Sequence, residues 1–111
     1  MTVYEGDNRP FSDIYREAAL EWVDCDAAAR MLEENKTAFL EKKKNDLDPD
    51  LPDSHRERIV KASAEWRDYL KKMVNAKTAA NRARVQLNYI EMKGWENRSA
   101  EATKRAEMRL T

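Results

Sequence analysis

The chain has 111 residues, of which 38% are charged, and its 21 basic and 21 acidic residues give a formal net charge of zero. This length suits a single domain, and no run of about 18 apolar residues occurs that could form a membrane-spanning helix. The only cysteine, Cys25, cannot form a disulfide within the chain. The opening residues MTVYEGDNRPFSD lack the basic and apolar regions of a signal peptide. We therefore expect a cytoplasmic protein with no membrane contact.

The composition favours long helices. Ala, Glu, Lys, Leu and Arg make up 56 of the 111 residues, a share typical of long helices and coiled coils. Glycine occurs only at positions 6 and 94, and proline only at positions 10, 49 and 52. The charge is unevenly divided, because residues 1–54 carry 7 basic and 14 acidic residues (net −7) and residues 55–111 carry 14 basic and 7 acidic residues (net +7). Either the two halves neutralise each other or one of them faces a charged partner.

The first predicted helix covers about residues 12–45, after a flexible N-terminal arm at 1–11. Ser12 is an N-cap type of residue, and the lysines of EKKKN at 41–45 suit a helix C-terminus. Pro49 requires the helix to stop before it. Mostly apolar positions spaced by three and four, with Glu21 and Asn35 at two of them, predict one buried face of this helix. The apolar ones are Ile14, Ala18, Cys25, Ala28, Leu32 and Phe39, with Phe11, Tyr15, Trp22 and Ala29 widening the face.

The acidic turn at about 46–53 has the spacing of a calcium-binding loop. Asp46, Asp48 and Asp50 stand at positions 1, 3 and 5 of a twelve-residue EF-hand loop, and Glu57 stands at position 12. Position 6, however, is Leu51 instead of the glycine that the sharp turn requires. We therefore expect a solvated acidic turn, with calcium binding as the alternative. No other metal and no cofactor is expected.

The second predicted helix covers about residues 54–110. Ser54 and Glu57 have the spacing of a capping box, and Ser63 is a second possible N-cap that would leave 55–62 as a separate short turn. Apolar and alanine residues then follow in alternating steps of four and three, which predicts a coiled-coil-like seam. The seam consists of Ala62, Trp66, Tyr69, Met73, Ala76, Ala80, Ala83, Leu87 and Ile90.

The seam changes phase after Ile90. Its next positions, Gly94 and Asn97, are not apolar, and the apolar spacing resumes one residue later at Trp95. A glycine within a helix costs up to about 1 kcal/mol relative to alanine. Gly94 therefore predicts a bend, a break, or a place where another chain comes close.

Together these elements predict an all-α fold, an antiparallel helical hairpin whose second helix is very long and has an alanine-rich seam. The shorter first helix cannot cover the second, so large apolar residues are left over and are interface candidates. They are Met92, Trp95, Met108 and Leu110. We expect self-association, with a dimer favoured, to complete a helical bundle. A three-helix monomer that folds back near Gly94 is the alternative.

The stretch YLKKMVNAKTAANRARVQLNYI, residues 69–90, contains no acidic residue. A basic helix face could contact nucleic-acid phosphates or an acidic partner. The candidate residues are Lys71, Lys72, Lys77, Asn81, Arg82 and Arg84. The alternative is that this stretch lies beside the acidic first helix and is neutralised by it, which the zero net charge of the chain favours.

No arrangement of catalytic residues is recognisable. His55 is the only histidine, so no histidine metal cluster can be built, no catalytic triad is evident, and no glycine-rich phosphate loop occurs. We expect a protein that is not an enzyme.

Two segments carry a resemblance: DIYREAALEWVDCDAAARMLEE and KASAEWRDYLKKMVNAKTAANRARVQLNYIEMKGWENRSAEATKRAEMRL. Their pattern of aromatic and alanine positions, over about residues 13–110, resembles short all-helical accessory proteins of tailed bacteriophages and prophages. That group has no established function and no defined functional residues, and some members are encoded beside single-strand annealing or other recombination functions.

Three functions are compatible with these observations. The resemblance implies a non-catalytic accessory in DNA recombination or replication, in the cytoplasm of the bacterial host, that contacts DNA or a DNA-bound recombination protein. The first alternative is an inhibitor or adaptor that binds a host nuclease or defence complex. The second is a structural coiled-coil component of a phage particle.

Overall fold

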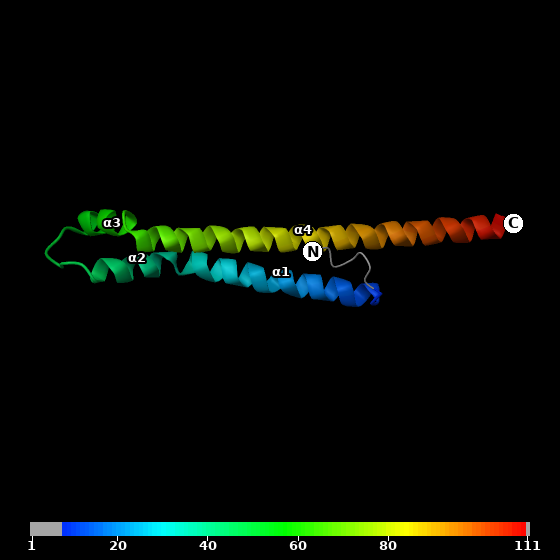
Figure 1. Ribbon diagram of the computed structural model, residues 1–111, viewed down its shortest axis with the longest axis horizontal. Coiled ribbons are helices and arrows are strands. Elements are labelled where there is room, and N and C mark those ends of the chain that lie inside the picture. The colour runs from blue at the N-terminus through cyan, green and yellow to red at the C-terminus, as the bar shows by residue number, and fades with distance from the viewer. Residues whose placement is uncertain (1–7, 111) are drawn as a thin grey trace. The chain divides into compact units, whose positions relative to one another are not determined.

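The computed structural model describes residues 8–110, all in helices and the segments that join them (Figure 1). The helices are α1 (Phe11–Glu34), α2 (Lys36–Asn45), α3 (Asp53–Lys61) and α4 (Ala64–Leu110). The described part of the chain contains no strand, which confirms the prediction of an all-α fold with a very long second helix. Most of the predicted N-terminal arm lies outside the described residues.

The chain divides into two compact units. The first combines the chain up to Val23 with the chain from Asn81 onward, and the second runs from Asp24 to Ala80. Both α1 and α4 therefore contribute to each unit.

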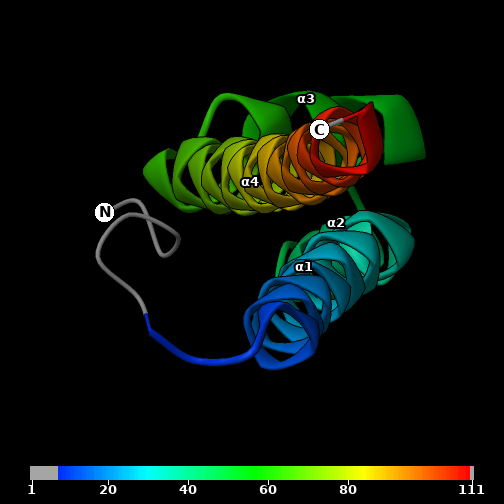
Figure 2. The ribbon, with the colours of Figure 1, turned by 90° about the vertical axis from the view of Figure 1, so that its right-hand side faces the viewer.

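In the first unit, the beginning of α1 packs antiparallel to the later part of α4, the blue and the yellow-to-orange ribbons of Figures 1 and 2. The core contains Ile14 and Ala18 from α1 and Leu87 and Ile90 from α4. Ile14 is 2% exposed and Ile90 is fully buried. The predicted seam positions at this end of α4 are therefore the positions that pack against α1.

Gly94 continues the buried seam, which therefore extends one position beyond Ile90, and the change of phase falls after Gly94. Gly94 is buried and α4 runs through it without interruption. A Cβ atom at this position would lie 2.8 Å from Cε2 and 3.0 Å from Cε1 of Phe11, and closer still to Cζ. The glycine is needed because the Phe11 ring rests on the helix backbone there. Of the three predicted roles, close approach is the one found, and the approaching group comes from the same chain.

In the second unit, the end of α1 and α2 pack antiparallel to the start of α4. Phe39, Trp66 and Tyr69 stack on one another, with the ring centroids of Phe39 and Tyr69 4.4 Å apart. The Tyr69 hydroxyl donates a hydrogen bond to the backbone carbonyl of Leu32. Trp66, Met73 and Ala80 are buried, as the seam predicts. In the part of α1 that belongs to this unit, Ala29 is buried, while the predicted Ala28 is exposed.

The first predicted helix, 12–45, is two helices that meet at Asn35. The backbone hydrogen bonds from Asn35 N to Met31 O (3.1 Å) and from Phe39 N to Asn35 O (2.9 Å) both span four residues. Helical bonding thus continues across Asn35, and the interruption is a local irregularity. At the other end α1 begins at Phe11, one residue before the predicted N-cap Ser12. The Pro10 carbonyl accepts the first helical hydrogen bonds, from the amides of Asp13 and Ile14.

The second predicted helix, 54–110, is divided into α3 and α4, and Ser63 is the reason. The Ser63 hydroxyl donates to the Val60 carbonyl (2.6 Å) and accepts from the Trp66 amide (3.2 Å), so it closes α3 and caps α4. The alternative boundary at Ser63 is confirmed. The predicted capping box is wrong, because α3 begins at Asp53 after Pro52 and no side chain caps it. Figure 2 shows α2 and α3 on different sides of the start of α4.

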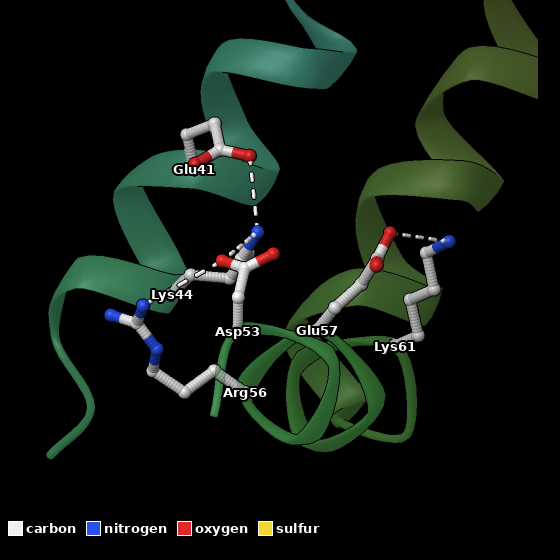
Figure 3. A network of polar contacts seen from close by, with 6 residues as sticks. All are labelled: Glu41, Lys44, Asp53, Arg56, Glu57 and Lys61. Atoms are coloured by element: carbon white, nitrogen blue, oxygen red, sulfur yellow. Dashed lines mark hydrogen bonds and ion pairs between the residues drawn. The ribbon is translucent and has the colours of Figure 1, made fainter. Parts of the chain in front are cut away.

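A charged network joins α2 to α3 in the second unit (Figure 3). Lys44 is buried, and its Nζ lies 2.7 Å from an Asp53 carboxylate oxygen and 3.2 Å from a Glu41 carboxylate oxygen. The hydrogen bond to Asp53 raises the pKa of Lys44 above its ordinary value, and the same bond lowers the pKa of Asp53. A buried cation is tolerated because it is paired. The network fixes the turn that the sequence suggested as a calcium loop.

Candidate functional site

Acidic residues of the chain neutralise only part of the predicted basic face. Three of its members, Lys71, Lys72 and Lys77, lie in the second unit. Lys77 forms an ion pair with Glu33 of α1, with 3.4 Å between Nζ and Oε1. Lys71 and Lys72 are exposed, and neither has a carboxylate partner among residues 8–110. Lys77 is thus neutralised by the acidic first helix, as the alternative interpretation predicts. Lys71 and Lys72 are available to an anionic partner.

The members in the first unit divide in the same way. The Arg84 guanidinium lies 4.8 Å from the centroid of the Trp22 ring, a cation–π contact with α1. Asn81 and Arg82 are exposed, and Arg82 has no acidic partner within the described chain. Arg84 therefore holds the two helices together, while Arg82 remains a candidate contact residue.

The four predicted interface residues all lie on the outside of α4. Their exposed fractions are 50% for Met92, 67% for Trp95, 68% for Met108 and 88% for Leu110. Every residue from Trp95 to Leu110 is exposed, and Figure 1 shows this orange-to-red end of α4 continuing past the start of α1. The Arg98 guanidinium lies 5.4 Å from the centroid of the Trp95 ring. We use the name C-terminal segment for residues 95–110.

A groove of about 290 Å³ lies where α1 begins against α4. The Tyr15 hydroxyl donates a 2.9 Å hydrogen bond to the Glu91 carboxylate, which raises the pKa of Tyr15. The groove is lined by Phe11, Tyr15, Glu91, Gly94, Trp95 and Arg98. Sequence reasoning missed it, because only the register between the helices brings residues 76 positions apart together.

The predicted calcium ligands are not assembled. The side chain of Asp48 accepts a 2.9 Å hydrogen bond from the Asp50 amide, and Glu57 pairs with Lys61 at 3.0 Å, one turn along α3. Within the described part of the chain, no group of three or more His, Cys, Asp or Glu side chains could hold a metal ion. The turn is therefore better explained by the Lys44–Asp53 network than by a bound cation.

Comparisons with known protein families, with curated proteins and with solved structures find no match. The functional interpretation therefore rests on the surfaces described above. Among residues 8–110, no helix combines the length and the apolar character needed to cross a membrane.

Proposed function

We propose that this chain is a non-catalytic accessory protein of the phage type. It acts in DNA recombination or replication in the bacterial host cell, and its working surface is α4. The observation that supports this proposal is the C-terminal segment, which continues past the start of α1 and is exposed throughout.

A helix end that is exposed along its whole length needs an explanation. The C-terminal segment is about 24 Å long at about 1.5 Å per residue. Tertiary packing of an apolar face supplies most helix stability in proteins. A helix of this length that also exposes Trp95 and Leu110 is better explained as a surface that packs on a partner.

Direct contact with nucleic acid would use the basic residues that the hairpin does not neutralise, Lys71, Lys72 and Arg82. Each phosphate that a basic side chain neutralises releases counterions and steepens the dependence of log K on log salt by about 0.9 for duplex DNA or about 0.7 for single strands. The zero net charge of the chain limits this binding to moderate strength. The arrangement suits an accessory that touches DNA beside a stronger binder.

The experiment measures binding to single- and double-stranded DNA over a series of salt concentrations. We expect binding at low salt, and we expect the Lys71→Gln/Lys72→Gln/Arg82→Gln variant to reduce the salt slope by about two to three units. Lys61→Gln is the matched control, because Lys61 already pairs with Glu57 on α3. Absence of binding at low salt would remove the direct-DNA form of the proposal and leave contact with a DNA-bound protein.

An inhibitor or adaptor of a host nuclease or defence complex is the second candidate, and it is favoured by an acidic row on α1. Asp13, Glu17 and Glu21 are exposed at spacings of four residues, with Glu17 paired to Arg9. Such a row suits a basic groove that normally holds nucleic acid. The test is a pull-down from host lysate whose nucleic acid has been digested. This candidate is favoured over the first if the wild-type chain recovers a host nuclease and the Asp13→Asn/Glu21→Gln variant does not. Co-purification with assembled particles would instead favour a structural component.

A further inference from the structure

A second heptad stripe runs along α4, separate from the seam that packs on α1. Its positions alternate in steps of three and four, the spacing of a coiled-coil face. They are Val85, Asn88, Met92, Trp95, Ser99, Ala102, Ala106 and Arg109. All of them lie in the first unit and all are exposed, with Val85 at 68%, Met92 at 50% and Trp95 at 67%.

The stripe lies largely on a side of α4 that α1 does not cover, with Trp95 at the edge of the groove where α1 begins. Successive helical residues are about 100° apart around the axis. Met92 therefore points about 160° away from Gly94, on which Phe11 of α1 packs. The stripe is accessible along its whole length, from Val85 beside the hairpin core to Arg109 in the C-terminal segment.

We propose that this stripe is the docking surface for the same stripe of a second copy of the chain, antiparallel and related by a twofold axis. This inference rests on the proposed role of α4 as an interaction surface, and it names the partner. The carrying observation is the distribution of side-chain size. The large apolar residues Val85, Met92 and Trp95 stand in the first half of the stripe, and the small residues Ser99, Ala102 and Ala106 stand in the second half.

Antiparallel pairing places the two largest apolar residues of the stripe, Met92 and Trp95, opposite small ones. In antiparallel coiled coils the first core position of one heptad faces the second core position of the partner's heptad. With the axis at position 97, Met92 lies opposite Ala102 of the second copy, and Trp95 lies opposite its Ser99. The outer layers then pair Asn88 with Ala106 and Val85 with Arg109. Alternation of large and small side chains across facing positions is what lets layers interdigitate at native density.

Parallel pairing gives a poorer fit. It would place Trp95 against Trp95 of the second copy and leave Ser99, Ala102 and Ala106 facing their own counterparts across a gap. Since core layers must be filled evenly, one end of a parallel pair would be crowded and the other hollow. The large side chains in the first half of the stripe need small side chains opposite them. The later half of the same stripe provides these small side chains. The surface is therefore self-complementary, as an isologous interface requires.

The charges beside the stripe give two attractive and two unfavourable contacts in this direction. Glu91, whose carboxylate accepts the Tyr15 hydrogen bond within the chain, would face Arg105 of the second copy, and the symmetry repeats this attractive pair. At the axis, Arg98 faces Arg98 of the second copy, and Glu96 faces its Glu96. Both contacts bring like charges together and are unfavourable. Arg98 already rests on the Trp95 ring, 5.4 Å from its centroid. Because Glu96 and Arg98 both flank the axis, each can turn toward an opposite charge.

The first test exchanges size across one layer and measures the association state by sedimentation equilibrium. We expect wild type to dimerise. Trp95 of each copy faces Ser99 of the other, so one substitution changes two equivalent layers. Trp95→Ser would leave two serines in each of these layers, and Ser99→Trp would place two tryptophans there. Each variant should raise the dimer Kd by about tenfold or more. An equimolar mixture of the two variants should dimerise again, because each layer then holds one tryptophan and one serine. Ala100→Trp is the matched control and should leave the Kd unchanged, since Ala100 is exposed but lies off the stripe.

The second test reads the direction by the distance between spin labels. In a Cys25→Ser background, a label at Asn81→Cys lies sixteen positions from the axis, which predicts an axial separation of about 48 Å in the antiparallel dimer at about 1.5 Å per residue. A parallel dimer would bring the two labels to about the interaxial distance of 8–10 Å, lengthened by the label arms. Circular dichroism of every variant checks that helix content is kept.

Monomeric wild type at about 100 µM, well above the Kd of stable homodimers, would overturn this inference, as would a short Asn81 distance. So would a mixture of Trp95→Ser and Ser99→Trp that stays as weakly associated as either variant alone. These outcomes are separate from the test of the proposed function. A dimer that binds neither DNA nor any host protein would refute the function and leave the antiparallel pairing intact.

Discussion

The close packing of Phe11 on Gly94 predicts that the effect of Gly94→Ala reverses its sign when the Phe11 ring is removed. In an exposed helix interior, replacing glycine by alanine stabilises by about 1 kcal/mol, because alanine loses less conformational freedom on folding. Here the added Cβ would lie 2.8 Å from Phe11 Cε2 and 3.0 Å from Cε1. Contacts under 3.0 Å cannot persist, so either the ring or the helix must shift.

The magnitude follows from the two opposing terms. Overpacking in a core costs about 1–3 kcal/mol, and the lower to middle part of that range applies because the ring lies at the first residue of α1 and can tilt. Gly94→Ala in the wild-type chain should therefore destabilise by about 1 kcal/mol, as a cost of about 2 kcal/mol exceeds a gain of about 1 kcal/mol. In a Phe11→Ala background the cost disappears, and the same substitution should stabilise by about 1 kcal/mol.

Urea unfolding of four chains, followed by far-UV circular dichroism, measures both effects. The chains are wild type, Gly94→Ala, Phe11→Ala and the double variant, and the coupling free energy should be about 2 kcal/mol. Changes should appear in the transition midpoint with the slope unchanged. If Gly94→Ala stabilises equally in both backgrounds, the coupling is zero and the packing of Phe11 on the α4 backbone is refuted.

Three further predictions concern the second unit. Ser63→Ala should destabilise the fold by about 1 kcal/mol because α4 loses its cap. Ser12→Ala is the control, because α1 begins at Phe11 and does not use Ser12 as a cap, and it should change the free energy of unfolding by less than about 0.5 kcal/mol. Equal losses in the two variants would contradict the assignment of Ser63 as the cap. The Lys44–Asp53 pair should stabilise the fold between about pH 4 and pH 10, because the folded-state pKa of Asp53 lies below 3.8 and that of Lys44 lies above 10.5. The stability difference between wild type and Asp53→Asn should thus shrink as the pH falls through the lowered pKa of Asp53, and a difference independent of pH in acid would argue against the pair. Addition of millimolar calcium should leave the melting temperature unchanged, and a rise of several degrees would restore the calcium-loop interpretation.

The seam was predictable because it depends on one helix alone. Residues seven apart, such as Trp66, Met73, Ala80 and Leu87, face the same side of any helix, and all four are buried. The exposure of Trp95 and Leu110 was also predictable, since the first helix is shorter than the second. Both inferences need only the number of residues per turn and the lengths of the two helices.

The rest depends on which residues meet across the hairpin, and periodicity does not contain that information. Gly94 looked like a defect in the seam because its contact, Phe11, is 83 positions earlier in the chain. Lys44 was recognisable only as one of the lysines that suit a helix C-terminus, because its partner Asp53 follows after the turn. The basic face divides for the same reason, since Lys77 finds Glu33 through the helix register and Lys71 finds no such partner in the described chain.

The end of the seam and the course of the second stripe have one physical basis. Beyond Gly94 the seam positions would be Asn97, Glu101, Lys104 and Met108, a largely polar row on which an apolar face of α1 could not pack favourably. Over the same turns, the second stripe holds Trp95, Ser99, Ala102 and Ala106, without a charge. The apolar side of α4 thus rotates away from α1 at the residue where α1 begins. A segment that merely extended past its partner would have no reason to keep heptad spacing on a new face, whereas a segment that packs on a second helix would.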